Sequence, residues 1–257
     1  MTDYPAGPRS TRFPWLLAVL SLLAFGILLA LGTWQVQRLH WKEALIATID
    51  SRLNAPPVPL AEIEATLAAG GDVDYQPAAV QGRFLHDKER FFFATFEGQS
   101  GWYVYTPLEL ADGRALFVNR GFVPYDRKDA ATRAEGQVAG EVTVTGLARS
   151  LLGEKPSSLL PDNEPAKNIY YWKDLPGMAN SAGLDAARVL PVFLDAGKAA
   201  NPGGLPRGGV TMVTMPNSHL QYAVTWYGLA LALAGVFATW IGRWIKARSA
   251  ARNSPRP

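Results

Sequence analysis

Residues 13–31 read FPWLLAVLSLLAFGILLAL, and residues 220–242 read LQYAVTWYGLALALAGVFATWIG. Neither stretch contains a charged residue, and each reaches the roughly 20 residues that a helix needs to cross the hydrocarbon core of a bilayer. The chain between them is polar enough to fold in water. We therefore expect two transmembrane helices, at 13–33 and 220–242, flanking one extramembrane domain at 34–219.

The charges beside the two apolar stretches predict their orientation. The leader at 1–12 holds two arginines against one aspartate, and the tail at 243–257 is basic without an acidic residue: Arg243, Lys246, Arg248, Arg252 and Arg256. Arg38 and Lys42 oppose this bias, but they belong to a long loop, which is translocated largely regardless of its charge. The positive-inside rule therefore predicts a cytoplasmic leader, a cytoplasmic tail and a periplasmic domain.

Composition narrows the class of protein. The net charge of +3 comes from the two ends, so the central domain is mildly acidic and nucleic acid is not an expected partner. The chain has no cysteine, which excludes disulfides, iron–sulfur clusters and thiolate ligands, and we assign no copper site. A short leader and a long first apolar stretch favour a bacterial cytoplasmic (inner) membrane over a mitochondrial precursor.

The central domain is predicted to be mainly antiparallel β, as a small barrel or sandwich with one or two short helices. Its clearest hairpin turns at Asp112 and Gly113. Alternating apolar and β-branched residues predict strands at 75–84, 90–96, 101–110, 114–122 and 141–148, with weaker strands at 168–172 and 189–194.

Helical patterns surround these strands. Apolar spacing continues from the first membrane stretch to about Leu53 as a juxtamembrane helix, and a second helix is expected at 60–69. Residues 153–165 and 196–209 are interpreted as loops, the second as a flexible linker back to the membrane. Small residues on the two membrane stretches would allow close packing, although ordinary membrane composition explains them equally well: Gly26, Ala30, Gly228, Ala232 and Gly235.

The usual catalytic motifs are missing, so we do not expect an enzyme. Imidazole chemistry is confined to three histidines. His86 lies in a polar run and is interpreted as part of a solvated turn. His40 and His219 both fall near the outer ends of the membrane stretches, where they could approach one ligand at the same depth.

Aromatic and cationic residues accompany His219. A helix would align Tyr222, Trp226 and Tyr227 with it, at i+3, i+7 and i+8. On the other stretch, Trp34 is expected at the interface and Arg38 just outside it. A flat apolar macrocycle with acidic groups would suit such surroundings, with neutral imidazole as axial ligand; an ordinary belt of interfacial residues is the alternative.

Three stretches carry a family resemblance: GTWQVQRLHWK at 32–42, VNRGFVP at 118–124 and NSHLQYAVTWYGLA at 217–230. They resemble the signature stretches of the Surfeit locus protein 1 family. The resemblance implies an assembly factor for haem-copper terminal oxidases that binds haem a and supports its delivery to the large catalytic subunit, with haem a synthase as a further possible partner. A structural chaperone without haem, stabilising an oxidase intermediate, is the alternative.

The resemblance also implies site residues. His219 matches the histidine implicated in haem binding and is expected to be the axial iron ligand, with support from Trp34, Arg38, Tyr222, Trp226 and Tyr227. Whether His40 supplies a second ligand stays open. Asn119, Arg120 and Gly121 of the second stretch are expected to be structural, with partner contact as the less favoured role.

Overall fold

The fold is described from a computed structural model, which describes residues 13, 15–211, 213 and 215–253. The chain divides into two compact units, one of residues 1–47 with 215–257 and one of residues 48–214. The predicted leader, with its two arginines, and Arg256 of the tail lie outside the described residues.

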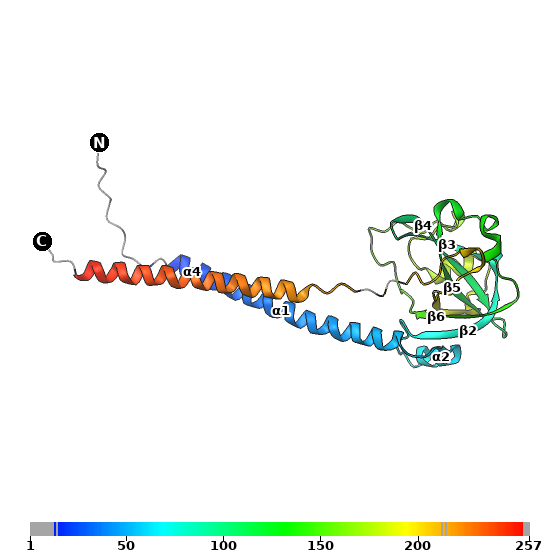
Figure 1. The fold of residues 1–257 in the computed structure, drawn as a ribbon, viewed down its shortest axis with the longest axis horizontal. Helices are drawn as coiled ribbons and strands as arrows, with labels where there is room; N and C mark the ends of the chain where they lie inside the picture. Colours follow the sequence, from blue (N-terminus) through cyan, green and yellow to red (C-terminus); the bar gives the residue numbers. More distant parts are fainter. Residues whose placement is uncertain (1–12, 14, 212, 214, 254–257) are drawn as a thin grey trace, which may run out of the picture. The chain divides into compact units, whose positions relative to one another are not determined.

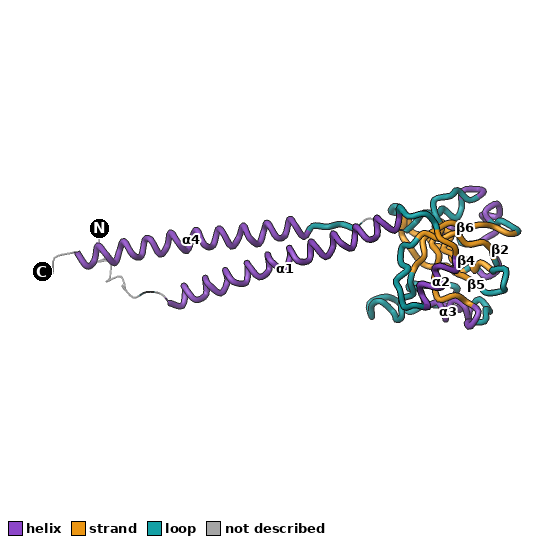
Figure 2. The backbone as a smooth tube through the Cα atoms, turned by 90° about the horizontal axis from the view of Figure 1, so that it is seen from below, coloured by secondary structure: helices purple, strands orange, loops and turns teal. Residues whose placement is uncertain are grey.

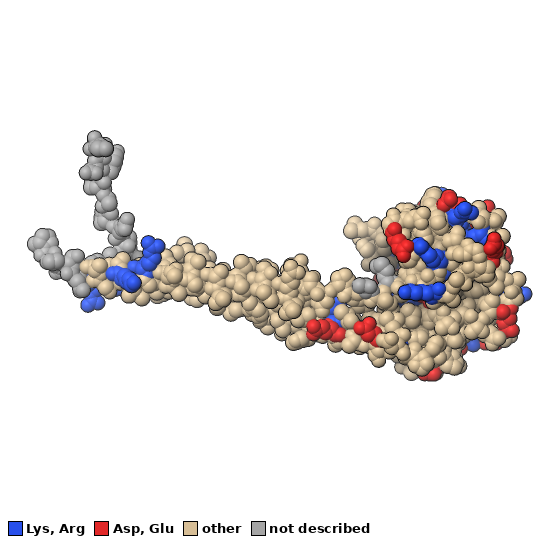
Figure 3. Space-filling model, viewed as in Figure 1, with Lys and Arg blue, Asp and Glu red and all other residues tan. Residues whose placement is uncertain are grey.

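The first unit holds most of α1 (Trp15–Leu53), whose last turns from residue 48 belong to the second unit, together with α4 (His219–Asn253). The two helices run side by side in both views (Figures 1 and 2). Each is long and apolar enough to cross a membrane, and only 11% and 6% of their apolar windows are buried. Helices of a soluble core would be largely buried instead. Lys and Arg side chains gather at the C-terminal end of α4, beyond a long uncharged surface (Figure 3).

The contact between α1 and α4 does not use the small residues that the sequence suggested. A Cβ atom at Gly26, Gly228 or Gly235 would meet nothing within 4 Å. At Gly32 it would lie 2.9 Å from the ring of Tyr227. The close approach is therefore between a glycine and an aromatic ring, and the prediction for those three glycines was wrong because they face away from the partner helix.

The second unit is a seven-stranded sheet in the order β1-β2-β6-β7-β5-β4-β3, in which an additional pairing of β2 with β4 closes five strands into a barrel (Figure 1). The strands are β1 (Val58–Pro59), β2 (Pro77–Phe84), β3 (Arg90–Phe96), β4 (Gln99–Glu109), β5 (Ala115–Pro124), β6 (Glu141–Arg149) and β7 (Val189–Ala196). Most pairs are antiparallel, whereas β5 with β7 and β1 with β2 are parallel. The predicted small, mainly antiparallel barrel is confirmed.

Two tight turns explain how β3, β4 and β5 follow one another. The predicted turn before β5 is present: Gly113 has φ +77°, and Asp112 Oδ1 accepts a hydrogen bond of 3.0 Å from the backbone N–H of Arg114. Between β3 and β4, Glu97 and Gly98 both have positive φ, as a two-residue turn with right-handed strand twist requires.

Side chains on the two faces of the barrel strands form separate cores, because successive side chains alternate between faces. Val80, Leu108, Val118 and Leu194 lie in the core that α2 (Leu60–Ala68) covers through Ile63. The opposite face carries a second cluster, to which α3 (Leu175–Ser181) contributes the buried side chains of Leu175, Met178 and Ala179. The helix predicted at 60–69 is confirmed, whereas α3 was not predicted.

Two expectations were wrong, the weak strand at 168–172 and the flexible linker at 196–209. Residues 168–172 form no strand in the described structure and make only isolated bridges, such as Phe92 with Tyr170. The segment at 196–209 is not a loose linker, since Arg207 exchanges backbone hydrogen bonds of 2.8 and 2.9 Å with Phe122. Its glycines permit close contact of backbone with backbone, which a composition-based interpretation as flexible does not distinguish.

Candidate functional site

His219 begins α4 and is tied to α1 by a hydrogen bond. Its Nδ1 lies 2.8 Å from Oε1 of Gln35, a side chain that is only 9% exposed. The backbone N–H of His219 also donates to Asn217 Oδ1, at 3.4 Å, which helps to fix the first turn of α4. The histidine is thus held from both its ring and its backbone.

The partner of Nδ1 determines which ring nitrogen is available. A carbonyl oxygen only accepts, so Nδ1 carries the proton that it donates to Gln35. In neutral imidazole the other nitrogen, Nε2, then has a free lone pair. No described residue hydrogen-bonds to this atom. Metal-ligating histidines commonly use this arrangement, with one nitrogen donating to a carbonyl and the other facing the metal.

The aromatic residues of α4 divide into two groups. Tyr222 is 54% exposed and Trp226 is half-buried, so both present ring surface beside the helix pair. Tyr227 packs its ring on Gly32, and its hydroxyl lies 3.1 Å from Thr33 Oγ1. Tyr227 therefore packs α4 against α1, whereas Tyr222 and Trp226 have ring surface on which a ligand could lie.

Of the residues proposed on α1, Trp34 directly precedes Gln35, and Arg38 lies at i+3 from Gln35 on the same side of the helix. Trp34 is exposed, and the Arg38 guanidinium lies 3.8 Å from the centre of the Trp41 ring. His40 is exposed and lies five residues beyond Gln35, about 140° around the helix at 3.6 residues per turn. The structure thus pairs His219 with Gln35 and does not bring His40 to the same face.

Gln35 is the site residue that sequence reasoning missed. It lies within the stretch at 32–42, but a glutamine near a membrane interface carries no specific chemical signal. What identifies it is burial together with a contact across 184 positions of the chain.

The described residues contain no group of three or more His, Asp or Glu side chains that could hold a metal ion. A bare ion at His219 would therefore lack a ligand cage. A metal that arrives within a macrocycle needs only an axial nitrogen, and His219 with neighbouring ring surface fits that requirement.

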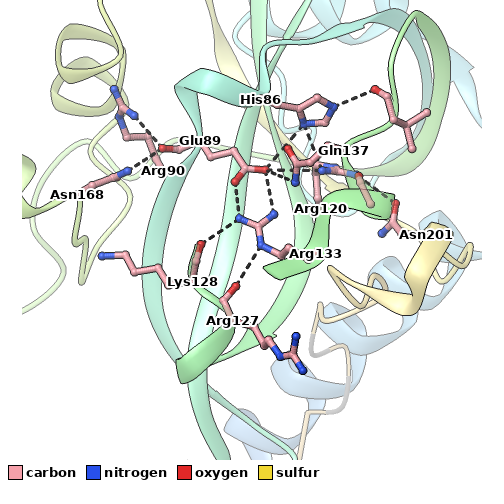
Figure 4. Close-up of polar contacts among 12 residues, drawn as sticks. His86, Glu89, Arg90, Arg120, Arg127, Lys128, Arg133, Gln137, Asn168 and Asn201 are labelled. Carbon is pink, nitrogen blue, oxygen red and sulfur yellow. Dashed lines mark hydrogen bonds and ion pairs between the residues drawn. The ribbon is translucent and has the colours of Figure 1, made fainter. Parts of the chain in front are cut away.

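His86 is not in a solvated turn, as the sequence suggested, but belongs to a buried polar network in the β domain (Figure 4). Its Nε2 donates to the carbonyl of Val138, at 2.9 Å. Glu89 lies at the centre of the network, where Arg133 binds both of its oxygens at 3.1 and 2.5 Å. The polar run around His86 predicts a solvated surface, because the pairing of Glu89 with Arg133, 44 positions away, leaves no local signal in the sequence.

Burial and charge act in opposite directions on Glu89. Burial alone would raise its pKa, but the contacts with His86, Arg133 and Arg120 lower it from an ordinary 4.5 to about 2. Arg120 is 2% exposed, and burial lowers its pKa to about 10. The Glu89 carboxylate and the Arg120 guanidinium are therefore both charged at neutral pH.

The VNRGFVP stretch supplies structural contacts around this network. Arg120 donates to the carbonyl of Gly136 and to Asn201 Oδ1, which ties two surface segments to β5. Asn119 Oδ1 accepts a hydrogen bond from the backbone of Gly121, at 3.1 Å. Gly121 has φ +122°, and a Cβ there would lie 2.0 Å from the carbonyl oxygen of Arg207. The expected structural role of these residues is confirmed.

The fold and the site together define a class of membrane-anchored barrel protein. Its features are two membrane-capable helices, a small closed barrel between them in the chain, and a histidine fixed at the helix pair. The sequence matches the model of the SURF1 family over residues 22–231. This chain belongs to the SURF1 family, whose members are known as cytochrome oxidase assembly factors.

Individual relatives match over most of their length. Surfeit locus protein 1 of Rattus norvegicus is 40% identical over 235 residues, covering 85% of this chain and 72% of the rat protein. The Homo sapiens protein of the same name is also 40% identical over 235 residues, covering 85% and 74%. A SURF1-like protein of Monosiga brevicollis is 38% identical over 249 residues, covering 92% and 89%. These three relatives are eukaryotic.

Proposed function

We propose that this protein is an assembly factor for a haem-copper terminal oxidase that holds haem a through His219 and supports its delivery to the large catalytic subunit. The observation that carries the proposal is the hydrogen bond from His219 Nδ1 to the buried side chain of Gln35. With the proton on Nδ1, the lone pair of Nε2 is the one that could bind a metal. Membership of the SURF1 family supports an oxidase as the client, because the family is known for cytochrome oxidase assembly.

The surroundings of His219 suit a flat, largely apolar macrocycle. Tyr222 and Trp226 offer ring surface on α4, and Trp34 and Arg38 lie on α1. Arg38 is exposed and carries a positive charge that could meet the acidic groups of haem. Bound haem supplies a redox-active iron; the chain's own residues orient the imidazole and keep its Nδ1 protonated.

A single histidine ligand from the protein would also suit a carrier. A closed pocket with two protein ligands would retain haem strongly, whereas a carrier must release it. We accordingly assign the protein the role of a chaperone rather than an enzyme, with haem a synthase as a possible donor of the haem.

The setting we propose is a bacterial cytoplasmic membrane, with both ends of the chain cytoplasmic and the β domain periplasmic. The basic end of α4 supports this orientation through the positive-inside rule (Figure 3).

The test is purification of the tagged full chain in detergent from cells that make haem a, with measurement of haem a and of copurifying oxidase subunit. We expect haem a in near-stoichiometric amount together with the large catalytic subunit. Copurification of the subunit with a haem-free protein would contradict the carrier role and favour the structural chaperone.

A further inference from the structure

The β domain contains a second place built for a ligand, independent of the proposed haem site. It is a pocket of about 410 Å³ on the outer face of the neighbouring strands β3, β4, β5 and β7. This volume is within the range of small-molecule sites. The residues that line it all fall between positions 75 and 211, within the second unit and away from the helix pair of the proposed haem site.

The floor of the pocket is polar and buried. Asp195, near the end of β7, is 5% exposed and accepts hydrogen bonds from Asn119 Nδ2 at 3.1 Å and Thr211 Oγ1 at 2.8 Å. Arg149 lies 3.8 Å from the same carboxylate and 2.9 Å from Asp74. The carboxylate of Asp195 is thus already supplied with donors.

Lys173 differs from these groups because its ammonium donates no hydrogen bond to any residue that the structure describes. Its Nζ lies 3.9 Å from Asp195 Oδ1, too far for a hydrogen bond, and no described residue accepts one from it. The ammonium lies 5.6 Å from the ring centre of Tyr105 and 5.4 Å from that of Phe193. Burial lowers the pKa of Lys173, although the charge of Asp195 partly opposes this effect.

The wall beside Lys173 is aromatic. Phe92 and Tyr103 are cross-strand partners whose ring planes differ by only 16°, with centres 6.5 Å apart. The ring centre of Tyr105 also lies 6.3 Å from that of Phe92. Walls of aromatic and apolar side chains with a few convergent polar groups are typical of small-molecule binding sites.

We infer that this pocket binds a small planar aromatic carboxylate, with its ring against Phe92 and Tyr103 and its carboxylate on Lys173. The unused ammonium donors select an anionic acceptor, since the carboxylate already in the pocket is satisfied by other donors. The flat apolar wall selects a ring.

The test titrates the full chain in detergent with 2-naphthoate and with its neutral analogue 2-naphthamide, by isothermal titration calorimetry. The two probes share a ring system, so the ratio of their affinities measures the contribution of the carboxylate charge. We expect naphthoate to bind at least tenfold more tightly. Equal affinities in the unaltered protein would overturn the inference without any variant.

Three variants locate the charge. Lys173→Met should bring naphthoate to the affinity of naphthamide, with naphthamide binding retained as evidence of an intact pocket, and Lys173→Arg should keep the preference. Lys167→Met, at a lysine that is 69% exposed, is the matched control and should change nothing. A preference that survives Lys173→Met would contradict the assignment.

Discussion

At the scale of single residues, the central feature is one imidazole whose proton is placed by its neighbour. Gln35 and His219 lie at distant positions in the chain and meet where α1 and α4 pack together. Their hydrogen bond fixes the tautomer that a metal ligand needs. The surrounding aromatic residues do not share this feature, because Tyr227 serves the packing of the helices instead.

Replacing Gln35 tests that feature directly. Gln35→Leu removes the acceptor for Nδ1 while leaving His219 in place, and we expect haem affinity to fall by about tenfold or more, as for other partners of metal-bound histidines. Gln35→Glu keeps an oxygen acceptor and should retain most of the affinity.

The matched control is Gln37→Leu, since Gln37 is exposed on the same helix. Haem affinities from titration of each purified variant provide the comparison. Equal losses in Gln35→Leu and Gln37→Leu would show that the effect is general to the helix and does not come from orientation of the imidazole.

At the scale of elements, the barrel is held to its surface segments by the network around Glu89. Glu89→Gln would leave two buried arginines without their counter-charge, so the free energy of unfolding should fall by about 3 kcal/mol or more. Urea unfolding of the full chain in detergent, followed by tryptophan fluorescence, measures this loss.

A surface carboxylate provides the control for Glu89. Glu109 pairs with Arg83, whose side chain is 63% exposed, so Glu109→Gln should change stability by about 1 kcal/mol at most. Similar losses for the two variants would argue against a special role for the buried network.

The same network predicts a pH dependence. Because the pKa of Glu89 is about 2 in the folded protein and 4.5 ordinarily, its contribution is fully present above the ordinary value and is lost as pH falls towards 2. The stability gap between the unaltered protein and Glu89→Gln should therefore shrink from pH 6 to pH 3. A gap that stays constant over this range would contradict the prediction.

The sequence predicted most elements because their signals are local. Alternation identified β2 to β7, and Asp112 with Gly113 identified the turn before β5. The helix α3 was missed because its seven residues are too few for a periodic signal. The parallel pairing of β5 with β7 and the closure of β2 on β4 depend on contacts between distant segments, which periodicity does not encode.

The candidate site shows the same division. The sequence could propose His219 as a candidate from the residues of its own segment, but the contacts of Gln35 and Gly32 could be recognised only once α1 and α4 were placed together. For His86 the sequence pointed the wrong way, because its polar neighbours predict an exposed side chain whereas the imidazole is partly buried.

At the scale of the whole molecule, we predict two membrane crossings with the β domain and the C-terminal tail on opposite sides. The chain has no cysteine, so single cysteines can report their side without background labelling. Ser158→Cys in the β domain should react with a membrane-impermeant maleimide in intact spheroplasts, whereas Ser249→Cys near the end of α4 should react only after permeabilisation. Labelling of both sites before permeabilisation would contradict the proposed topology.

The proposed carrier role depends on one nitrogen atom, so the most direct test compares histidines. A reduced-minus-oxidised spectrum is recorded for the full chain purified from haem a-producing cells, beside His219→Ala and His40→Ala. We predict that His219→Ala loses the haem a signal while His40→Ala, at an exposed histidine on another face of α1, keeps it. Unchanged haem a in His219→Ala would contradict the account.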